Sequence, residues 1–242
     1  MQFHNTLNPK IWKNDKLKKE VELKLNLIAR AFIDFLEIPK GAVKDIRITG
    51  SSANYNYTPN SDLDLHIIVD YNQVHKNCPL VEGYLWAKKA QFNKEHDIKI
   101  YGIPVEMYAE NSRTPAVSNG TYSLKFSKWL KVPEKIKPLT NDGAVKAKYE
   151  ELKDAIENCG NAEESKEILE KIYIMRRNGL SKEGEFSTEN LAFKKLRNAG
   201  LIDKLKQERK DSFDKELTLE DYNLIWSEVK FVLEQFEGFE TW

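Results

Sequence analysis

The sequence predicts an α/β protein, in which a small mixed β-sheet flanked by helices is followed by an all-α C-terminal lobe. Apolar residues alternate with polar ones in the segments between residues 45 and 108, as in half-buried strands. Beyond residue 142 they recur at every third or fourth position, as in helices. Turn-forming residues separate the two patterns, and we therefore expect two domains, residues 1–137 and residues 138–242.

The chain is expected to begin with a helix over residues 15–37, for which Asp15 can serve as the N-cap. A half-buried strand should follow at residues 45–49, with Ile46 and Ile48 on one face. The helix is indicated by apolar residues at three- and four-residue steps, namely Leu17, Val21, Leu25, Ile28, Phe32 and Phe35.

A second strand is predicted over residues 62–69, with Asp62, Asp64 and His66 on one face. Its other face is apolar and consists of Leu63, Leu65, Ile67 and Val69. A helix over residues 79–94 should then cover one side of the sheet.

Residues 98–101 and 105–108 are expected to form a hairpin or a bent strand, which turns Glu106 and Tyr108 to the same face. The aromatic and basic stretch 122–133 has no assignment. In the C-terminal lobe the periodicity predicts four helices, at 143–157, 162–178, 188–198 and 219–236, with Asp142, Asn161, Ser187 and Thr218 as their N-caps.

The composition excludes several classes of protein. Lys and Arg number 38 and Asp and Glu also number 38, so any basic surface must be local. Cys78 and Cys159 lie far apart and the four histidines are scattered, which argues against a zinc site or a disulfide scaffold. No apolar run approaches the roughly 18 residues of a membrane span and the N-terminus lacks an apolar core, so we expect a soluble, cytoplasmic protein.

The strongest functional signal is Gly50-Ser51, followed by ten residues and then Asp62-Leu63-Asp64-Leu65. Residues two apart on a strand face the same way, so the carboxylates of Asp62 and Asp64 should converge. Two such anions suit Mg²⁺, which prefers carboxylate, water and phosphate oxygens. The backbone of a Gly-Ser turn, with the Ser51 hydroxyl, can approach phosphates closely. These features fit one substrate, a magnesium-bound nucleoside triphosphate.

In these residues the sequence resembles the DNA polymerase beta superfamily of nucleotidyltransferases, whose motif is an apolar strand, Gly-Ser, a short spacer and Asp-x-Asp. The resemblance implies that residues 1–137 form the catalytic domain and that a third carboxylate lies on a later strand. Glu106 is the best match, although Asp is common there, and Asp97 and Glu110 are rivals.

The resemblance also implies a mechanism, in which Asp62, Asp64 and Glu106 hold two Mg²⁺ ions, with Mn²⁺ as a substitute. The donor would be an NTP, expected to be ATP, whose β and γ phosphates contact Ser51 and Ser52 and whose pyrophosphate leaves. The acceptor hydroxyl could belong to RNA, a nucleotide, a small molecule or a protein. The competing class is a catalytically degenerate fold that acts as a nucleotide sensor or interaction protein, and the presence of all three carboxylates argues against it.

Other candidates have a functional and a structural interpretation. Lys194 and Arg197, three residues apart on one helix, suit a triphosphate or a nucleic-acid backbone, and we include them as nucleotide-binding residues. For eight further residues, a structural role explains their presence equally well or better. That role is packing, a surface position or complementarity to a helix dipole, and the residues are Tyr55, Tyr57, His66, Tyr122, Ser123, Lys125, Arg176 and Arg177. The sequence does not predict an oligomeric state.

Overall fold

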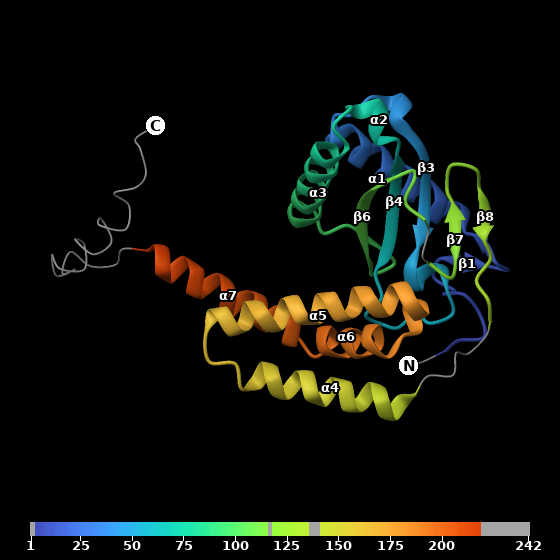
Figure 1. The fold of residues 1–242 in the computed structure, drawn as a ribbon. Coiled ribbons are helices and arrows are strands. Elements are labelled where there is room, and N and C mark those ends of the chain that lie inside the picture. Colours follow the sequence, from blue (N-terminus) through green and yellow to red (C-terminus); the bar gives the residue numbers. More distant parts are fainter. Residues whose placement is uncertain (1–2, 116–117, 136–140, 219–242) are drawn as a thin grey trace, which may run out of the picture. The chain divides into compact units, whose positions relative to one another are not determined.

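The computed structural model describes residues 3–115, 118–135 and 141–218. Contacts divide the chain into two compact units (Figure 1). The first unit comprises the chain up to Asn141 together with Gly179–Asn190. The second comprises Asp142–Asn178 and the residues from Leu191 onward. No helix within the described ranges is both long and apolar enough to cross a membrane.

The first unit is built on a six-stranded mixed sheet, as the sequence predicts. The strands have the order β5-β6-β4-β3-β7-β8, and neighbours are antiparallel except for β4 and β6, which are parallel. The strands are β3 (Val43–Thr49), β4 (Leu63–Val69), β5 (Lys99–Ile100), β6 (Ile103–Asn111), β7 (Thr121–Ser123) and β8 (Lys128–Lys131).

Helices α1 and α3 pack against β4 and β6 and against each other (Figure 1). The helical segments of this unit are α1 (Lys19–Leu36), η1 (Lys40–Ala42), η2 (Gly50–Ala53), α2 (Tyr71–Val74), α3 (Cys78–Glu95) and η3 (Gly184–Phe186). The helices cover the apolar face of the sheet, where Leu63, Leu65 and Ile67 are fully buried. Strand alternation then turns Asp64 and His66 to the opposite face, which we call the polar face.

The predicted start of the first helix is wrong. Residues 12–17 instead form a hairpin of β1 (Trp12–Lys13) and β2 (Lys16–Leu17), and α1 begins only at Lys19. Asn14 and Asp15 adopt positive φ angles of 51° and 57° and make the two-residue turn. Asn and Asp tolerate this left-handed conformation better than most residues, so Asp15 turns a hairpin rather than capping a helix.

The predicted hairpin at residues 98–108 is confirmed, with Tyr101 and Gly102 forming its turn at φ angles of 50° and 81°. The unassigned stretch 122–133 supplies part of β7 and all of β8. It is held by an aromatic cluster in which the Trp12 ring stacks on Trp129 at 4.7 Å and meets Tyr122 edge-on at 5.1 Å. Tyr122 and Trp129 also lie opposite each other on β7 and β8, with ring centroids 5.3 Å apart, and cross-strand aromatic pairs of this kind stabilise short strands.

The second unit is helical, as predicted. The helices of the C-terminal region are α4 (Asp142–Glu157), α5 (Ala162–Glu183), α6 (Thr188–Asn198) and α7 (Leu201–Leu217). Asn161 caps α5 by accepting the Glu164 N–H at 2.9 Å, and Ser187 caps α6 through the Asn190 N–H. Helix α7 was not predicted, and the helix predicted at 219–236 lies outside the described residues. The unit encloses its own core of Leu152, Ile156, Leu169, Ile172, Phe193, Leu196, Ile202 and Leu205.

Candidate functional site

Three carboxylates meet on the polar face of the sheet. The parallel register pairs Asp64 of β4 with Glu106 of β6, and Asp62 directly precedes β4. Carboxylate oxygens of Asp62, Asp64 and Glu106 all lie within 4.8 Å of one another, and all three residues are half-buried. The sheet therefore brings together residues more than 40 positions apart into one cluster, which we call the acidic cluster.

Gly50 leaves the space that the Asp64 carboxylate occupies. A Cβ at this glycine would lie 2.0 Å from Asp64 Oδ2, and the φ of Gly50 is +69°, a conformation that residues with side chains rarely adopt. The Gly50 N–H is donated to the Ser118 hydroxyl at 3.2 Å. Glycine is thus required both by the backbone and by the approach of the carboxylate.

The turn after β3 is tied to Asp62 through Ser52. The buried Ser52 hydroxyl donates to the Asp62 carbonyl oxygen at 2.6 Å, and the Trp12 indole N–H donates to the Ser52 carbonyl oxygen at 2.7 Å. The Ser51 hydroxyl, which is less buried, donates to Ser61 Oγ at 2.9 Å. Both serines therefore help to join the two ends of the loop between β3 and β4.

The sequence analysis missed Lys89, which reaches the acidic cluster from α3. Its Nζ lies 3.2 Å from Glu106 Oε1 and 4.3 Å from the centre of the Tyr108 ring. Asn93, one turn further along α3, bonds to both the N–H and the carbonyl of Met107. No motif signals Lys89, because its role depends on how α3 is rotated against β6.

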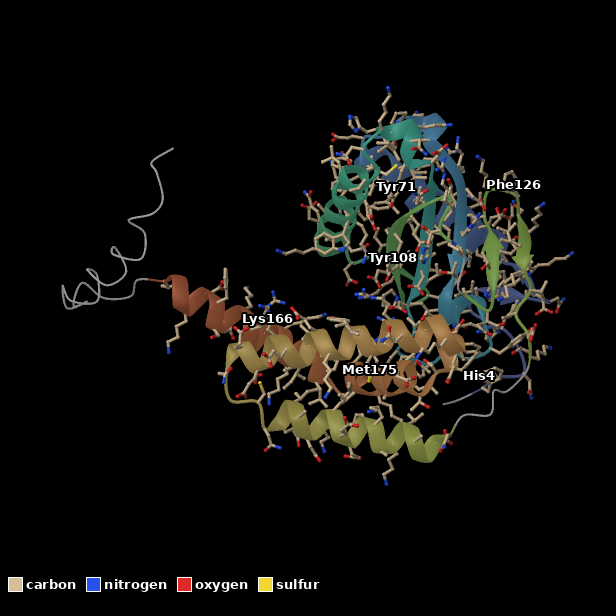
Figure 2. All side chains as sticks on the ribbon, viewed as in Figure 1. His4, Tyr71, Tyr108, Phe126, Lys166 and Met175 are labelled. Atoms are coloured by element: carbon tan, nitrogen blue, oxygen red, sulfur yellow. The ribbon has the colours of Figure 1, made fainter. Side chains whose placement is uncertain are left out.

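Tyr108, labelled in Figure 2, lies two residues after Glu106 on β6 and therefore on the same, polar face of the sheet. Burial, and then the negative charges of Asp64 and Glu106, raise the pKa of its hydroxyl above the usual value. The His66 ring stacks on the Tyr108 ring at 4.5 Å. Tyr108 is therefore a neutral, rigidly held neighbour of the carboxylates, and its position two residues after Glu106 on one strand was the available sequence signal.

The rival carboxylates lie elsewhere in the described structure. Asp97 forms an exposed ion pair with Lys99, at 2.6 Å. Glu110 Oε1 lies 3.0 Å from His66 Nδ1, further along β6 than Glu106. Geometry therefore groups Glu106, and neither rival, with Asp62 and Asp64.

Most of the secondary candidates have structural contacts. Tyr55 is 3% exposed within the core, and Tyr57 stacks on His4 at 3.9 Å. Tyr122 packs on Trp12, and the buried Ser123 hydroxyl donates to Asp45 at 2.6 Å. The remaining contacts are Lys125 Nζ to the Lys44 carbonyl at 3.0 Å and the Arg176 guanidinium 4.2 Å from the Phe193 ring centre. Lys194 and Arg197 lie on α6, in the second unit, and Arg177 is exposed on α5.

The donor set of the acidic cluster suits a hard divalent cation. It offers only carboxylate oxygens, which Mg²⁺ and Mn²⁺ accept, and none of the imidazole or thiolate groups that favour zinc or copper. Lys89 brings a positive charge to this cluster through its ion pair with Glu106. The arrangement can bind divalent cations and the phosphates that accompany them.

The family is shown by comparison with known sequences. The model of the nucleotidyltransferase domain family matches residues 28–172, more than half of the chain, so the protein belongs to this family within the DNA polymerase beta superfamily. The matched range includes the Gly-Ser turn and the whole acidic cluster, a combination consistent with a transferase enzyme.

Among solved structures, the chain is similar to the STING-associated CdnE c-di-GMP synthase from Capnocytophaga granulosa. The sequences are 12% identical, the match covers 83% of this chain and 84% of that one, and the TM-score is 0.26. The comparison with curated proteins finds no match.

Proposed function

We propose that the protein transfers a nucleoside monophosphate from an NTP, ATP in the first instance, to an acceptor hydroxyl and releases pyrophosphate. The supporting observation is the acidic cluster of Asp62, Asp64 and Glu106 within a nucleotidyltransferase domain. We further propose that this cluster holds two Mg²⁺ ions, for which Mn²⁺ can substitute. Bound there, the ions would neutralise phosphate charge and make the acceptor hydroxyl more acidic.

In the proposed reaction, the acceptor oxygen attacks the α-phosphorus and the bond from that phosphorus to the bridging oxygen breaks. The bridging oxygen keeps the electron pair and leaves as part of pyrophosphate. Glu106 takes the proton of the acceptor hydroxyl, and Lys89 holds that carboxylate in place. Positioning and charge neutralisation supply most of the rate in such displacements.

The phosphates of the donor need partners other than carboxylates. We propose that Gly50 and Ser51 contact them, because this turn lies against Asp64 and its backbone can approach a ligand closely. The Ser52 hydroxyl is buried and bonded to Asp62, so we assign Ser52 to holding the turn in place. Lys194 and Arg197 are our proposed additional contacts to the triphosphate.

The acceptor is best identified directly. The protein is incubated with each α-labelled NTP and Mg²⁺, with and without total RNA, and labelled RNA, labelled protein and small products are separated. We expect ATP to label RNA or a nucleotide product. Binding of NTP by the wild-type protein with no labelled product under any condition would instead support a degenerate, nucleotide-sensing fold.

The role of the acidic cluster is tested by Asp64→Asn, which removes a ligand charge at nearly constant shape. We expect transfer to be abolished and the melting temperature to be unchanged or slightly raised, since a repelling charge is lost. The matched control is Asp97→Asn, which neutralises an exposed carboxylate in the same unit. Retention of more than a few per cent of transfer by both Asp62→Asn and Asp64→Asn would contradict the proposal.

A further inference from the structure

A groove of about 550 Å³ lies beside the β1–β2 hairpin, outside the acidic cluster. Its volume falls in the range of roughly 300–1,000 Å³ that is typical of small-molecule sites. Its lining residues include Trp12, the turn residues Asn14 and Asp15, and three lysines, Lys13, Lys18 and Lys135. Lys135 comes from a segment more than 100 residues from the hairpin, so the groove is made by the tertiary fold.

The groove carries an excess of positive charge. Three lysines are among its lining residues, and Asp15 supplies the one carboxylate among the described lining residues. In the part of the chain that the structure describes, none of the three lysines forms an ion pair. Lys18 and Lys135 instead lie over the Tyr101 and Tyr55 rings, at 5.7 Å and 5.2 Å. These contacts hold the lysine side chains without neutralising their charge.

The walls of the groove are fixed by hydrogen bonds. The Trp129 indole N–H donates to the Asp15 carbonyl at 2.9 Å, which holds the turn against β8. Trp12 is 3% exposed and donates to the Ser52 carbonyl in the turn that approaches Asp64. A ligand in the groove would therefore meet a preformed surface that is connected to the loop between β3 and β4.

We propose that this groove binds closely spaced phosphate groups, supplied by a free polyphosphate or by a nucleic-acid backbone. Three lysines that form no ion pair among the described residues, and whose charge Asp15 offsets only in part, attract such groups. Binding here needs no divalent cation, in contrast to the acidic cluster, whose three carboxylates repel phosphates unless a cation neutralises them.

The test measures binding by the full-length protein in EDTA, by calorimetry for inorganic triphosphate and by fluorescence anisotropy for a labelled 12-nucleotide RNA. Lys13→Glu and Lys135→Glu should each weaken binding about tenfold, the loss expected for a charge-assisted contact. Lys16→Glu is the matched control, because Lys16 lies on the same hairpin but does not line the groove. It should change affinity by less than about twofold.

Asp15→Asn provides a test in the opposite direction. Asn tolerates the left-handed backbone of this position, and the bond from Trp129 goes to the main chain, so the hairpin should be retained. Loss of the carboxylate should strengthen phosphate binding about two- to threefold. A residue with a purely structural role would not produce a gain in affinity.

The two probes distinguish the source of the phosphates. Tighter binding of triphosphate than of RNA assigns the groove to a free polyphosphate, and the reverse order assigns it to a nucleic acid. Failure of the wild-type protein to bind either probe overturns the proposal. Equal binding by wild type, Lys13→Glu and Lys135→Glu does so as well. The same measurements on Asp64→Asn, which should bind normally, keep this result independent of the proposed transferase activity.

Discussion

At the scale of single residues, Gly50 affects both the backbone conformation of the turn and the position of the Asp64 carboxylate. Gly50→Ala would place a methyl group on the Asp64 carboxylate and also force an alanine into a left-handed conformation, which by itself costs about 1–2 kcal/mol. We expect a larger loss of unfolding free energy than that, together with weakened Mn²⁺ binding, measured by urea denaturation and by calorimetry.

The matched control is Gly102→Ala. Gly102 also has a positive φ, of 81°, but nothing lies within 4 Å of the position that its Cβ would occupy. It should therefore show the conformational cost alone and leave Mn²⁺ binding unchanged. Equal effects at the two glycines on both measurements would show that the approach of Asp64 to Gly50 is unimportant.

Glu110 gives the polar face a pH dependence. Burial raises the pKa of this carboxyl, but the hydrogen bond and charge of His66, with a contribution from Arg47, outweigh burial and lower it below its usual 4.5. A lowered folded-state pKa stabilises the protein above the unfolded-state value, and this contribution is lost as the pH falls through the folded-state value.

Glu110→Gln should therefore flatten the acid side of the stability profile. Wild type should lose unfolding free energy relative to the variant as the pH is lowered from about 5 towards 3, as measured by urea denaturation at each pH. Just above pH 5, where Glu110 is ionised in both the folded and the unfolded state, the two curves should run parallel. Identical slopes of wild type and variant below pH 5 would rule out the contribution of Glu110.

At the scale of elements, α3 is positioned by the Asn93 side chain, which bonds to the backbone of β6 as a neighbouring strand would. The Asn93 amide accepts from the Met107 N–H at 3.0 Å and donates to the Met107 carbonyl at 2.9 Å. Asn93→Ala should cost about 1–3 kcal/mol of unfolding free energy, because two partly buried backbone groups lose their partner. It should also lower turnover, since Lys89 on the same helix would hold Glu106 less firmly.

Gln91→Ala is the control for Asn93, because the one hydrogen bond of the Gln91 side chain within the described residues goes to the exposed Glu95 of the same helix. It should stay within about 0.5 kcal/mol of wild type in urea denaturation. A loss at position 93 no greater than that at position 91 would mean that α3 is held by its apolar contacts alone.

The elements also show which parts of the fold are predictable from sequence. Strands β3 and β4 were predicted because alternating residues face a core and a polar surface, and the same alternation placed Asp62 and Asp64 together. The hairpin at residues 12–17 was missed because Leu17 fits a helical period as well as a strand. Its turn depends on the conformations of Asn14 and Asp15, which periodicity does not reveal.

At the scale of the whole molecule, the residues that the sequence analysis missed are those that only the tertiary structure brings close to their partners. Lys89 belongs to a helix whose rotation decides what it contacts, and Glu185 lies more than 60 residues from its partners. The Glu185 carboxylate accepts from the Asn119 N–H at 3.0 Å and the Asn56 amide at 3.3 Å. Residues 179–190 thus belong with the first unit, and the predicted division at residue 137 stays a prediction.

Whether the C-terminal helices serve the donor is testable with Lys194→Glu combined with Arg197→Glu. If both residues contact the triphosphate, NTP binding with Mg²⁺ and no acceptor should weaken by about 1 kcal/mol or more per charge, because charge-assisted hydrogen bonds are lost. Lys195→Glu is the control on the same helix. If the pair instead contacts a nucleic-acid acceptor, NTP affinity should survive while the KM for that acceptor rises and its salt dependence becomes shallower. We expect the first result, because the triphosphate is strongly negative and the acidic cluster itself supplies only anions. A correctly folded double variant with unchanged NTP affinity would show that expectation to be wrong.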